Sequence, residues 1–485
     1  MSSAAASLEG VSPIEHPPDS NAADTPVVPE ARAAARHEGE GLAKRAVNAG
    51  KWTGISFVVD QGLAFVSNIM LVYFAVPREA FGLMALILTI NQGLTMFSDV
   101  GIAPCLIQNE REDPAFYNTA WTMQTVRGVV LWVVACLLSY PVSQWRDDWA
   151  PLMYLLPVAS LTVLINGFQS TAWITAQRQL NIRIMSLIRA GVAVFRIASM
   201  AVIAWFSPTA WALVGGLVVN ALLLCIASHF MIPAIKNRFY FEKEAFWSLI
   251  KYGRWLFLST VITFFAGQLD KLLLGSLISV TALGVFYIGA RFADLAPVFF
   301  KQVGQMVGFP ALSDVYRRDE ERFKTALLKM RLVLTLPINV FLLGMIAGGP
   351  MITWLFYGNS PTPGFIEAGW IIQVLCFNSL AGMVTTSYGH VFMASGRTLF
   401  NTLSVAVQVV VMAVCLLTGY HLAQEKGFIL AIGVTQWVKY ASDAAMAKAC
   451  GVWQWKFDAA VLISCGLLAW VALQVSEWLA WRFVL

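Results

Sequence analysis

The sequence is poor in charged side chains. Asp, Glu, Lys and Arg make up 13% of its 485 residues, whereas a soluble globular domain carries about 25%. Hydrophobic residues reach 58%, and the mean hydropathy is +0.67. The apolar residues form near-continuous runs of about 20 residues, not the weak alternation of a membrane barrel. These features exclude a soluble globular protein and indicate an all-α, polytopic helical membrane protein.

Cysteine and histidine patterns typical of metal or disulfide sites are also missing. The seven cysteines lie in apolar runs or at their ends, and none forms a CxxC motif or a cluster with one of the five histidines. We therefore predict small buried cysteines, no metal site and no cofactor. The net charge of +5 comes from basic residues in particular short loops. Because such residues set membrane topology, no nucleic-acid partner is expected.

Residues 1–40 contain few bulky side chains and are rich in Ala, Pro, Ser, Glu and Asp. This composition predicts a disordered cytoplasmic tail. The basic start, apolar core and cleavage site of a signal peptide are missing, so we expect no removal of this segment. Residues 41–51, with Lys44, Arg45 and Lys51, favour a short amphipathic helix on the membrane surface.

Long apolar runs then follow in two sets of six, and a further run ends the chain. Each is long enough to cross ~30 Å of hydrocarbon at ~1.5 Å per helical residue. The expected spans are 52–76, 81–107, 118–141, 150–172, 184–206, 210–232, 252–278, 281–308, 326–347, 365–392, 398–418, 427–447 and 457–481. The predicted parts are an N-terminal six-helix bundle at 41–232, a cytoplasmic connector at 233–251, a C-terminal six-helix bundle at 252–450, and an additional transmembrane helix in 451–485.

The two sets of spans resemble each other at a spacing of 202 residues. Gly82 matches Gly284, Ala80 matches Ala282 and Leu71 matches Leu273. The chain therefore predicts two copies of one helical bundle that face each other. Basic residues gather in alternate loops, from Lys44 and Arg45 at the start to Lys448 and Lys456 near the end. This bias predicts a cytoplasmic N-terminus, and an odd number of spans puts the C-terminus outside.

Several short motifs point to one family. They are Pro-Arg-Glu-Ala-Phe-Gly-Leu at 77–83, Phe-Ser-Asp-Val-Gly at 97–101, Ala-Pro-Cys-Leu-Ile-Gln at 103–108, Gln-Leu-Asp-Lys at 268–271 and Ala-Leu-Gly-Val-Phe-Tyr at 282–287. The first three resemble the "P-E-x-F-G-L" and "F-S-D-x-G-…-L-I-Q" patterns of the Wzx-type polysaccharide/O-antigen flippases. These flippases belong to the multidrug/oligosaccharidyl-lipid/polysaccharide (MOP) exporter superfamily. The likeness extends over about residues 50–450.

This resemblance implies two six-helix bundles, related by a pseudo-twofold axis, around a central cavity, with about 12–14 transmembrane helices in total. It further implies export of undecaprenyl-diphosphate-linked oligosaccharide across the bacterial inner membrane, for exopolysaccharide or O-antigen. The implied partners are this lipid-linked oligosaccharide, membrane lipid, and polysaccharide polymerase and chain-length machinery. The long N-terminal tail and the thirteenth span depart from the pattern of relatives with twelve or fourteen spans.

Four of the arginines inside predicted spans are candidates for substrate binding, because a charge within a span costs at least ~2.5–3.5 kcal/mol unless it faces water or a partner. We expect Arg196 and Arg291, supported by Arg127 and Arg189, to bind the diphosphate, because guanidinium forks match phosphate oxygens and remain charged. Simpler roles remain open. Arg291 could pair locally with Asp294, and Arg127 and Arg189 could extend to the membrane surface.

Six further charged residues are candidates for coupling or gating. Asp60 lies roughly two turns into the first span and Asp270 lies deep in the seventh. Either could carry a coupling proton or cation, or Asp270 could pair with the adjacent Lys271 or with another helix. Asp99 and Lys301 correspond at the spacing of 202 residues and favour a gate ion pair or a helix-end role. Asp294, three residues after Arg291, completes the set.

Two other functions remain as alternatives. A cation-coupled multidrug exporter of the same fold would favour a cavity lined by acids, which Arg196 and Arg291 argue against. A membrane glycosyltransferase or polymerase would need a catalytic acid on an outer loop. Those loops offer no recognisable constellation and only Glu79, Asp147, Asp148, Glu367 and Glu425. We therefore expect a transporter and not an enzyme.

Overall fold

The structure is a computed structural model of the 485-residue chain. It describes residues 29–483 apart from 100, 110, 112, 180, 233–235, 254–255, 304–311, 313–314, 317–319 and 363. The described residues are predominantly helical, and no strand occurs among them. The chain divides into two compact units, Met1–Asn48 and Ala49–Leu485. All the functional residues discussed below lie in the second unit.

The helices follow the predicted apolar runs. In chain order they are α1 (Pro29–Tyr73), α2 (Arg78–Phe97), α3 (Ile102–Gln108), α4 (Pro114–Ser143), α5 (Leu152–Gly167), α6 (Ala172–Arg178), α7 (Ile182–Phe206), α8 (Ala210–Phe230), α9 (Lys243–Gly253), α10 (Leu256–Leu277), α11 (Val280–Ala293), α12 (Leu295–Val303), α14 (Glu320–Tyr357), α15 (Ala368–Ala394), α16 (Thr398–Ala449) and α17 (Trp455–Phe483). Short 3-10 turns lie at Asp147–Trp149 (η1) and Phe365–Glu367 (η3). Residues 29–40, predicted as part of a disordered tail, belong to α1, while residues 1–28 lie outside the described part.

The chain is a multi-pass membrane protein. Nine described helices are long and apolar enough to cross a membrane, or up to eleven segments if each of two bent helix pairs is one span. Helix α16 contains two passes, because its backbone leaves the helical region at Ala423 and Gln424. There the chain reverses and brings the backbones of Gly419 and Gly427 into close contact. The predicted spans 398–418 and 427–447 are therefore the two arms of a hairpin.

Three predicted spans are broken or bent, which the apolar pattern did not indicate. The run 81–107 ends its first helix at Phe97, and α3 starts after Gly101, whose φ of 65° lies in the left-handed region. The Asp99 carboxylate accepts a hydrogen bond from the Gly101 N–H at 2.9 Å and holds this break. The run 281–308 bends by 47° between α11 and α12, and α5 meets α6 at 63°.

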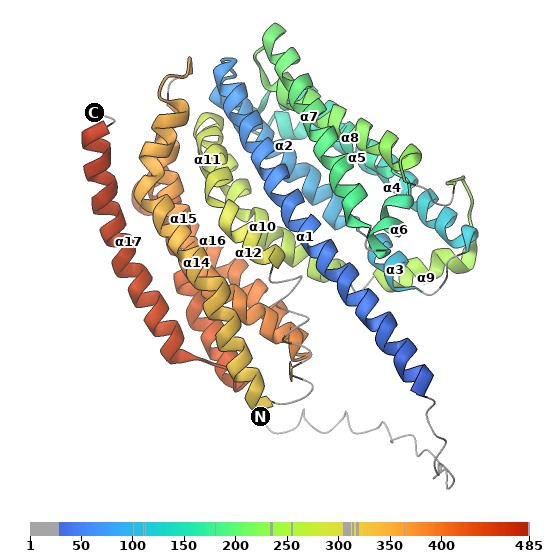
Figure 1. Ribbon diagram of the computed structural model, residues 1–485. Helices are drawn as coiled ribbons and strands as arrows, with labels where there is room; N and C mark the ends of the chain where they lie inside the picture. The colour runs from blue at the N-terminus through green and yellow to red at the C-terminus, as the bar shows by residue number, and fades with distance from the viewer. Residues whose placement is uncertain are drawn as a thin grey trace, which may run out of the picture. The chain divides into compact units, whose positions relative to one another are not determined.

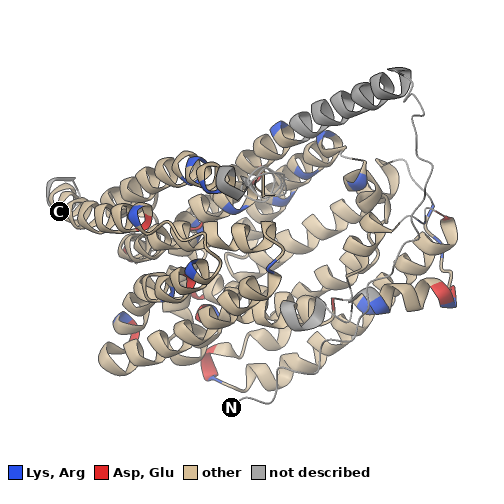
Figure 2. Cartoon of the chain, turned by 90° about the horizontal axis from the view of Figure 1, so that it is seen from below, with Lys and Arg blue, Asp and Glu red and all other residues tan. Residues whose placement is uncertain are grey.

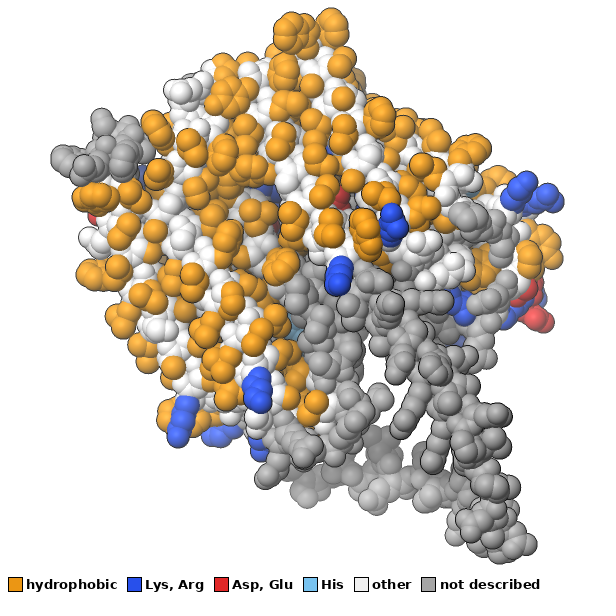
Figure 3. All heavy atoms as spheres, viewed as in Figure 1, with side chains coloured by type: hydrophobic (Ala, Val, Ile, Leu, Met, Phe, Trp, Pro, Cys, Tyr) orange, Lys and Arg blue, Asp and Glu red, His pale blue; other side chains and the backbone are white. Residues whose placement is uncertain are grey.

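The helices form two groups with α2, α10 and α11 between them. On one side α4, α5, α7 and α8 pack together, and on the other α14, α15, α16 and α17 do (Figure 1). Between them α2 packs against both α10 and α11. Charged residues are sparse along the helices (Figure 2). Hydrophobic side chains cover most of the described surface in the view of Figure 3, as contact with lipid requires.

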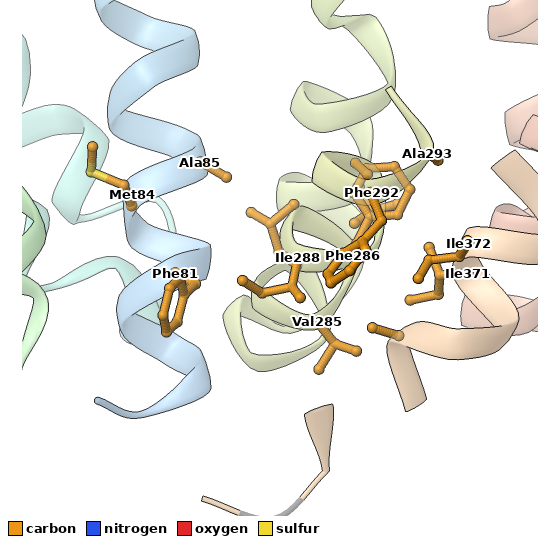
Figure 4. Close-up of a cluster of buried hydrophobic side chains, with 14 of the residues drawn as sticks. Phe81, Met84, Ala85, Val285, Phe286, Ile288, Phe292, Ala293, Ile371 and Ile372 are labelled. Atoms are coloured by element: carbon orange, nitrogen blue, oxygen red, sulfur yellow. The ribbon is translucent and has the colours of Figure 1, made fainter. Parts of the chain in front are cut away.

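The junction of the two groups is a buried apolar cluster. Figure 4 shows side chains of α11 between α2, which contributes Phe81, and α15, which contributes Ile371 and Ile372. Two glycines allow the close approach of α2 and α11. A Cβ on Gly82 would meet the Val280 carbonyl oxygen, and a Cβ on Gly284 would meet that of Arg78. Small residues at helix crossings serve this purpose in membrane proteins.

Candidate functional site: an arginine-lined cavity

A cavity of ≈310 Å³ lies between helices of the two predicted halves. Asp60 and Gln61 of α1 line it together with Arg189 and Arg196 of α7 and Arg291 of α11. Ala64, Ala193, Asn220 and Leu224 complete the wall. The structure therefore brings together three of the four arginines predicted to bind substrate, and one of the predicted coupling acids. Packing of the helices brings these residues together, although Asp60 and Arg291 are about 230 residues apart in the sequence.

Arg291 is held in a defined position by its own helix. It donates a hydrogen bond to the Tyr287 hydroxyl at 2.8 Å, and its guanidinium carbon lies 4.9 Å from the centre of the Tyr287 ring. It belongs to the last turn of α11, where the helix dipole favours a cation. The side chain keeps solvent-accessible surface although protein surrounds it. This combination is typical of a group that lines an internal aqueous cavity.

Arg196 carries hydrogen-bonding capacity that the described protein does not use. Its Nε is buried and has no hydrogen-bond partner among the described residues. Arg196 and Arg291 lie within electrostatic range of each other, and Arg196 also interacts electrostatically with Asp60. Two neighbouring guanidinium groups repel, and an anion between them would remove that repulsion. The cavity is therefore suited to an anionic ligand with several acceptor oxygens.

Asp60 partly balances these charges. Its carboxylate interacts electrostatically with Arg189 and Arg196, and it accepts a hydrogen bond of 3.5 Å from the Ser56 hydroxyl one turn earlier. Arg189 also lies over the ring of Trp173, with 5.3 Å from its guanidinium carbon to the ring centre. Three arginines and one aspartate thus line this cavity.

A second charged group borders Arg291. Asp294 interacts electrostatically with Arg291 and with Lys271 and Asp270 of α10. The Lys271 Nζ lies 4.0 Å from the Asp270 Oδ1, which is too long for a hydrogen bond. That Oδ1 is buried and has no hydrogen-bond partner in the described part of the chain. The predicted pairing of Asp270 with Lys271 is therefore loose. No ion pair joins Arg291 to Asp294 among the described residues, so a tight local pair is not formed.

A larger chamber of ≈520 Å³ adjoins the cavity and shares Asp60, Gln61 and Arg189 with it. Its other lining residues are Thr53, Ser56, Phe57, Gln177, Ile182, Met185, Ser186, Val298 and Gln302. The two chambers extend along α1 from Ala64 to Thr53, away from the end of the helix at Tyr73. The site therefore opens toward the end of the bundle that carries the start of α7 and the end of α12.

The opposite end is closed by contacts between the two halves. The Thr281 hydroxyl donates to the Glu79 carboxylate at 2.7 Å. The Val280 N–H donates to the Asp148 carboxylate at 3.1 Å, and Arg146 donates to the Ser276 carbonyl at 3.1 Å. Arg146 also pairs with Asp148 at 2.9 Å. These contacts lie at the same end as the Gly82 and Gly284 crossing, and the larger chamber lies toward the other end.

Arg127 does not reach this site. It lines a separate cavity of ≈250 Å³ between α2, α3, α4 and α5, together with Asp99. Its Nε donates to the Ser98 hydroxyl at 2.9 Å, and its guanidinium lies 3.8 Å from the Asp99 carboxylate. Asp99 thus has both a charged partner and a helix-end role, through Gly101. Lys301 is exposed on α12, within electrostatic range of His390.

Two buried ion pairs were not predicted from the sequence. Arg331 of α14 and Asp458 of α17 are both fully buried and lie 2.6 Å apart. The hydroxyls of Tyr388 and Tyr440 donate to the same carboxylate at 2.6 and 2.9 Å. In α16 Lys439 pairs with Asp443 at 2.9 Å. These four residues are also charged side chains within apolar runs, which is the feature that singled out Arg196 and Arg291 in the sequence.

The sequence and the fold have known relatives. Residues 76–360, more than half of the chain, match the family model described as Polysaccharide biosynthesis protein. The chain is 24% identical over 362 residues to the lipopolysaccharide biosynthesis protein WzxC of Escherichia coli (strain K12), covering 73% of this chain and 71% of that protein. It is 22% identical to the succinoglycan biosynthesis transport protein ExoT of Rhizobium meliloti (strain 1021), covering 61% and 59%.

Solved structures establish the fold. The lipid II flippase MurJ in an inward closed conformation superposes with a TM-score of 0.68 at 12% identity, covering 88% of this chain and 92% of that one. An inward-facing multidrug resistance MATE family transporter of the MOP superfamily gives a TM-score of 0.58 at 15% identity, covering 80% and 95%. The fold predicted from the sequence is thereby confirmed. With the match over residues 76–360, the chain belongs to the Polysaccharide biosynthesis protein family.

Proposed function

We propose that the protein is a flippase that moves undecaprenyl-diphosphate-linked oligosaccharide outward across the bacterial inner membrane. The observation that carries this proposal is the internal cavity lined by Arg189, Arg196 and Arg291, with Asp60 as the one acid among its lining residues. A lipid-linked oligosaccharide of this kind carries its charge on the diphosphate. Arginine forks bind phosphate oxygens in pairs and remain charged at any physiological pH.

The names of the relatives support the same substrate class. WzxC is named for lipopolysaccharide biosynthesis, ExoT for succinoglycan transport, and TuaB of Bacillus subtilis (strain 168) for teichuronic acid biosynthesis. MurJ, which shares the fold, is named a lipid II flippase. By the same proposal, this protein transports its substrate without changing it chemically. The exported unit would then pass to polysaccharide polymerase and chain-length machinery.

The mechanism would be alternating access. With the N-terminus in the cytoplasm, as the basic loops favour, the closed end at Glu79 and Thr281 faces outward and the open chambers face the cytoplasm. The diphosphate would enter from that side and bind between α7 and α11. Rocking of residues 50–232 against residues 250–447 around the cavity would then separate the contact between Glu79 and Thr281 and expose the diphosphate to the outside, while the isoprenoid tail stays in lipid.

A cation-coupled drug exporter is the second candidate, because the fold also matches a multidrug transporter and Asp60 lines the cavity. The excess of arginines argues against a cationic cargo. Proteoliposomes separate the two functions. Purified protein should translocate a polyprenyl-diphosphate-linked oligosaccharide and leave a lipophilic cation such as ethidium outside. Transport of ethidium alone would transfer the assignment to drug export.

A further inference from the structure

The larger chamber presents neutral hydrogen-bonding groups from three separate helices. The amides of Gln61, Gln177 and Gln302 come from α1, α6 and α12 and line its wall. None of these amides hydrogen-bonds to another described residue. Gln61 also lines the smaller, arginine-rich cavity, so it lies where the two chambers meet.

The two chambers differ in charge. Asp60 and Arg189 border both, whereas Arg196 and Arg291 line only the smaller one. The charged groups of the larger chamber therefore balance, and those of the smaller chamber leave an excess of positive charge. A ligand with an anionic part and a neutral polar part would match the two chambers in this order.

Gln61 and Gln302 are partly buried and Gln177 is exposed, so all three amides can reach water or a ligand in the chamber. Burying an amide in an apolar environment without a hydrogen bond costs several kcal/mol on water-to-hydrocarbon scales, so such side chains face water or a polar ligand. An amide offers both a donor and an acceptor. Sugar hydroxyls also donate and accept, and an amide can bind them without adding charge. The Phe57 ring in the same wall supplies an apolar surface for a sugar face.

We propose that the larger chamber binds the uncharged sugar that is attached to the diphosphate, and that Gln61, Gln177 and Gln302 determine specificity for it. This inference rests on the proposed function, because it requires the diphosphate to lie between Arg196 and Arg291. Gln61 contacts the sugar nearest to the phosphate. Gln177 and Gln302 lie further along the chamber and contact its more distant hydroxyls.

The test compares two lipids that share the diphosphate and differ in the sugar. Binding of undecaprenyl diphosphate and of undecaprenyl-diphosphate-linked glucose is measured on the full chain in nanodiscs. Wild-type protein should bind the glucose-linked lipid more tightly. Gln177→Leu and Gln302→Leu should each reduce that affinity by about five- to tenfold, as expected for a lost hydrogen bond, and leave the affinity for undecaprenyl diphosphate unchanged. Gln144→Leu, at an exposed position after α4, is the matched control.

Each contrary result has a separate meaning. Equal affinity of wild-type protein for the two lipids would overturn the sugar chamber, as would an equal loss of both affinities in the glutamine variants. The proposal is also wrong if Gln177→Leu, Gln302→Leu and their combination bind the glucose-linked lipid as wild type does. Failure of wild-type protein to bind either lipid would instead reject the proposed function itself, and the sugar chamber with it.

Discussion

Gly82 and Gly284 occupy equivalent places in one reciprocal contact. A Cβ on Gly82 would collide with the Val280 carbonyl oxygen, and a Cβ on Gly284 with the Arg78 carbonyl oxygen. Residues 78 and 280 are separated by the same 202 positions as residues 82 and 284. Glu79 and Thr281, also 202 residues apart, hydrogen-bond to each other. The spacing found in the sequence therefore appears in the fold as contacts between equivalent positions.

This crossing should not tolerate a methyl group. Gly82→Ala and Gly284→Ala force backbone atoms apart, and we expect each to destabilise the protein by about 1–3 kcal/mol, as overpacking does. Thermal unfolding in detergent measures the loss. Gly344→Ala is the control, because no atom lies within 4 Å of a Cβ at that position. Unfolding of Gly82→Ala at the same temperature as Gly344→Ala would show that the helices are not packed this closely.

The closed end should respond to a cross-link. In a Glu79→Cys, Thr281→Cys variant with the native cysteines replaced, oxidation should join the two halves and stop transport, and reductant should restore it. The reason is that the native side chains lie within hydrogen-bond distance, at 2.7 Å. Each single-cysteine variant is a control that oxidation should leave active. Full transport by the oxidised double variant would contradict the opening of this end during the cycle.

The buried pair of Arg331 and Asp458 should be necessary for the attachment of α17. Removing either partner leaves an unpaired buried charge, so Asp458→Leu or Arg331→Met should destabilise the protein by about 3–5 kcal/mol. The double replacement removes both charges and should recover much of that loss. Unfolding temperatures of the four proteins form a double-mutant cycle. Strictly additive losses would show that the two groups do not depend on each other.

The start of α4 should be sensitive to acid. The Asp113 carboxylate accepts hydrogen bonds from the Arg111 guanidinium and from the Phe116 N–H. Both hydrogen bonds lower the pKa of Asp113 below its usual range. A lowered pKa in the folded state contributes stability above the ordinary carboxyl pKa, and this stability is lost as pH falls through the lowered value. At neutral pH Asp113→Ala should therefore cost about 1 kcal/mol as a lost helix cap. The difference in unfolding temperature from wild type should shrink below about pH 4. A difference independent of pH would contradict the role of the charge.

The sequence was sufficient to predict the helices and to mark Arg189, Arg196 and Arg291, which line one cavity, because both predictions depend on local composition. An apolar run long enough to span a membrane becomes a helix in almost any packing, and a mid-span charge such as Arg196 must face a cavity or a partner. The same argument could not assign Arg127 to its cavity. The position of a residue along its span can be counted from the sequence. Which other helix packs against that residue depends on contacts between distant segments.

The breaks within helices could not be predicted from the pattern of apolar residues either. The break at Asp99 and Gly101 depends on a side-chain hydrogen bond and one left-handed residue, and neither interrupts hydropathy. The partner of Asp458 could not be identified either, since Arg331 lies 127 residues away on another helix. Both positions could have been marked as buried charges, but their pairing required the fold.

The most direct test of the central claim is the affinity for undecaprenyl diphosphate of wild-type protein and of an Arg196→Gln, Arg291→Gln variant. Both arginines line the cavity, and the Nε of Arg196 has no hydrogen-bond partner among the described residues. Hydrogen bonds to charged groups contribute about 1.5–3 kcal/mol each, so the double variant should bind at least about 100-fold more weakly. Arg127→Gln, in the separate cavity, should bind as wild type does. Unchanged affinity in the double variant would contradict a diphosphate site between α7 and α11.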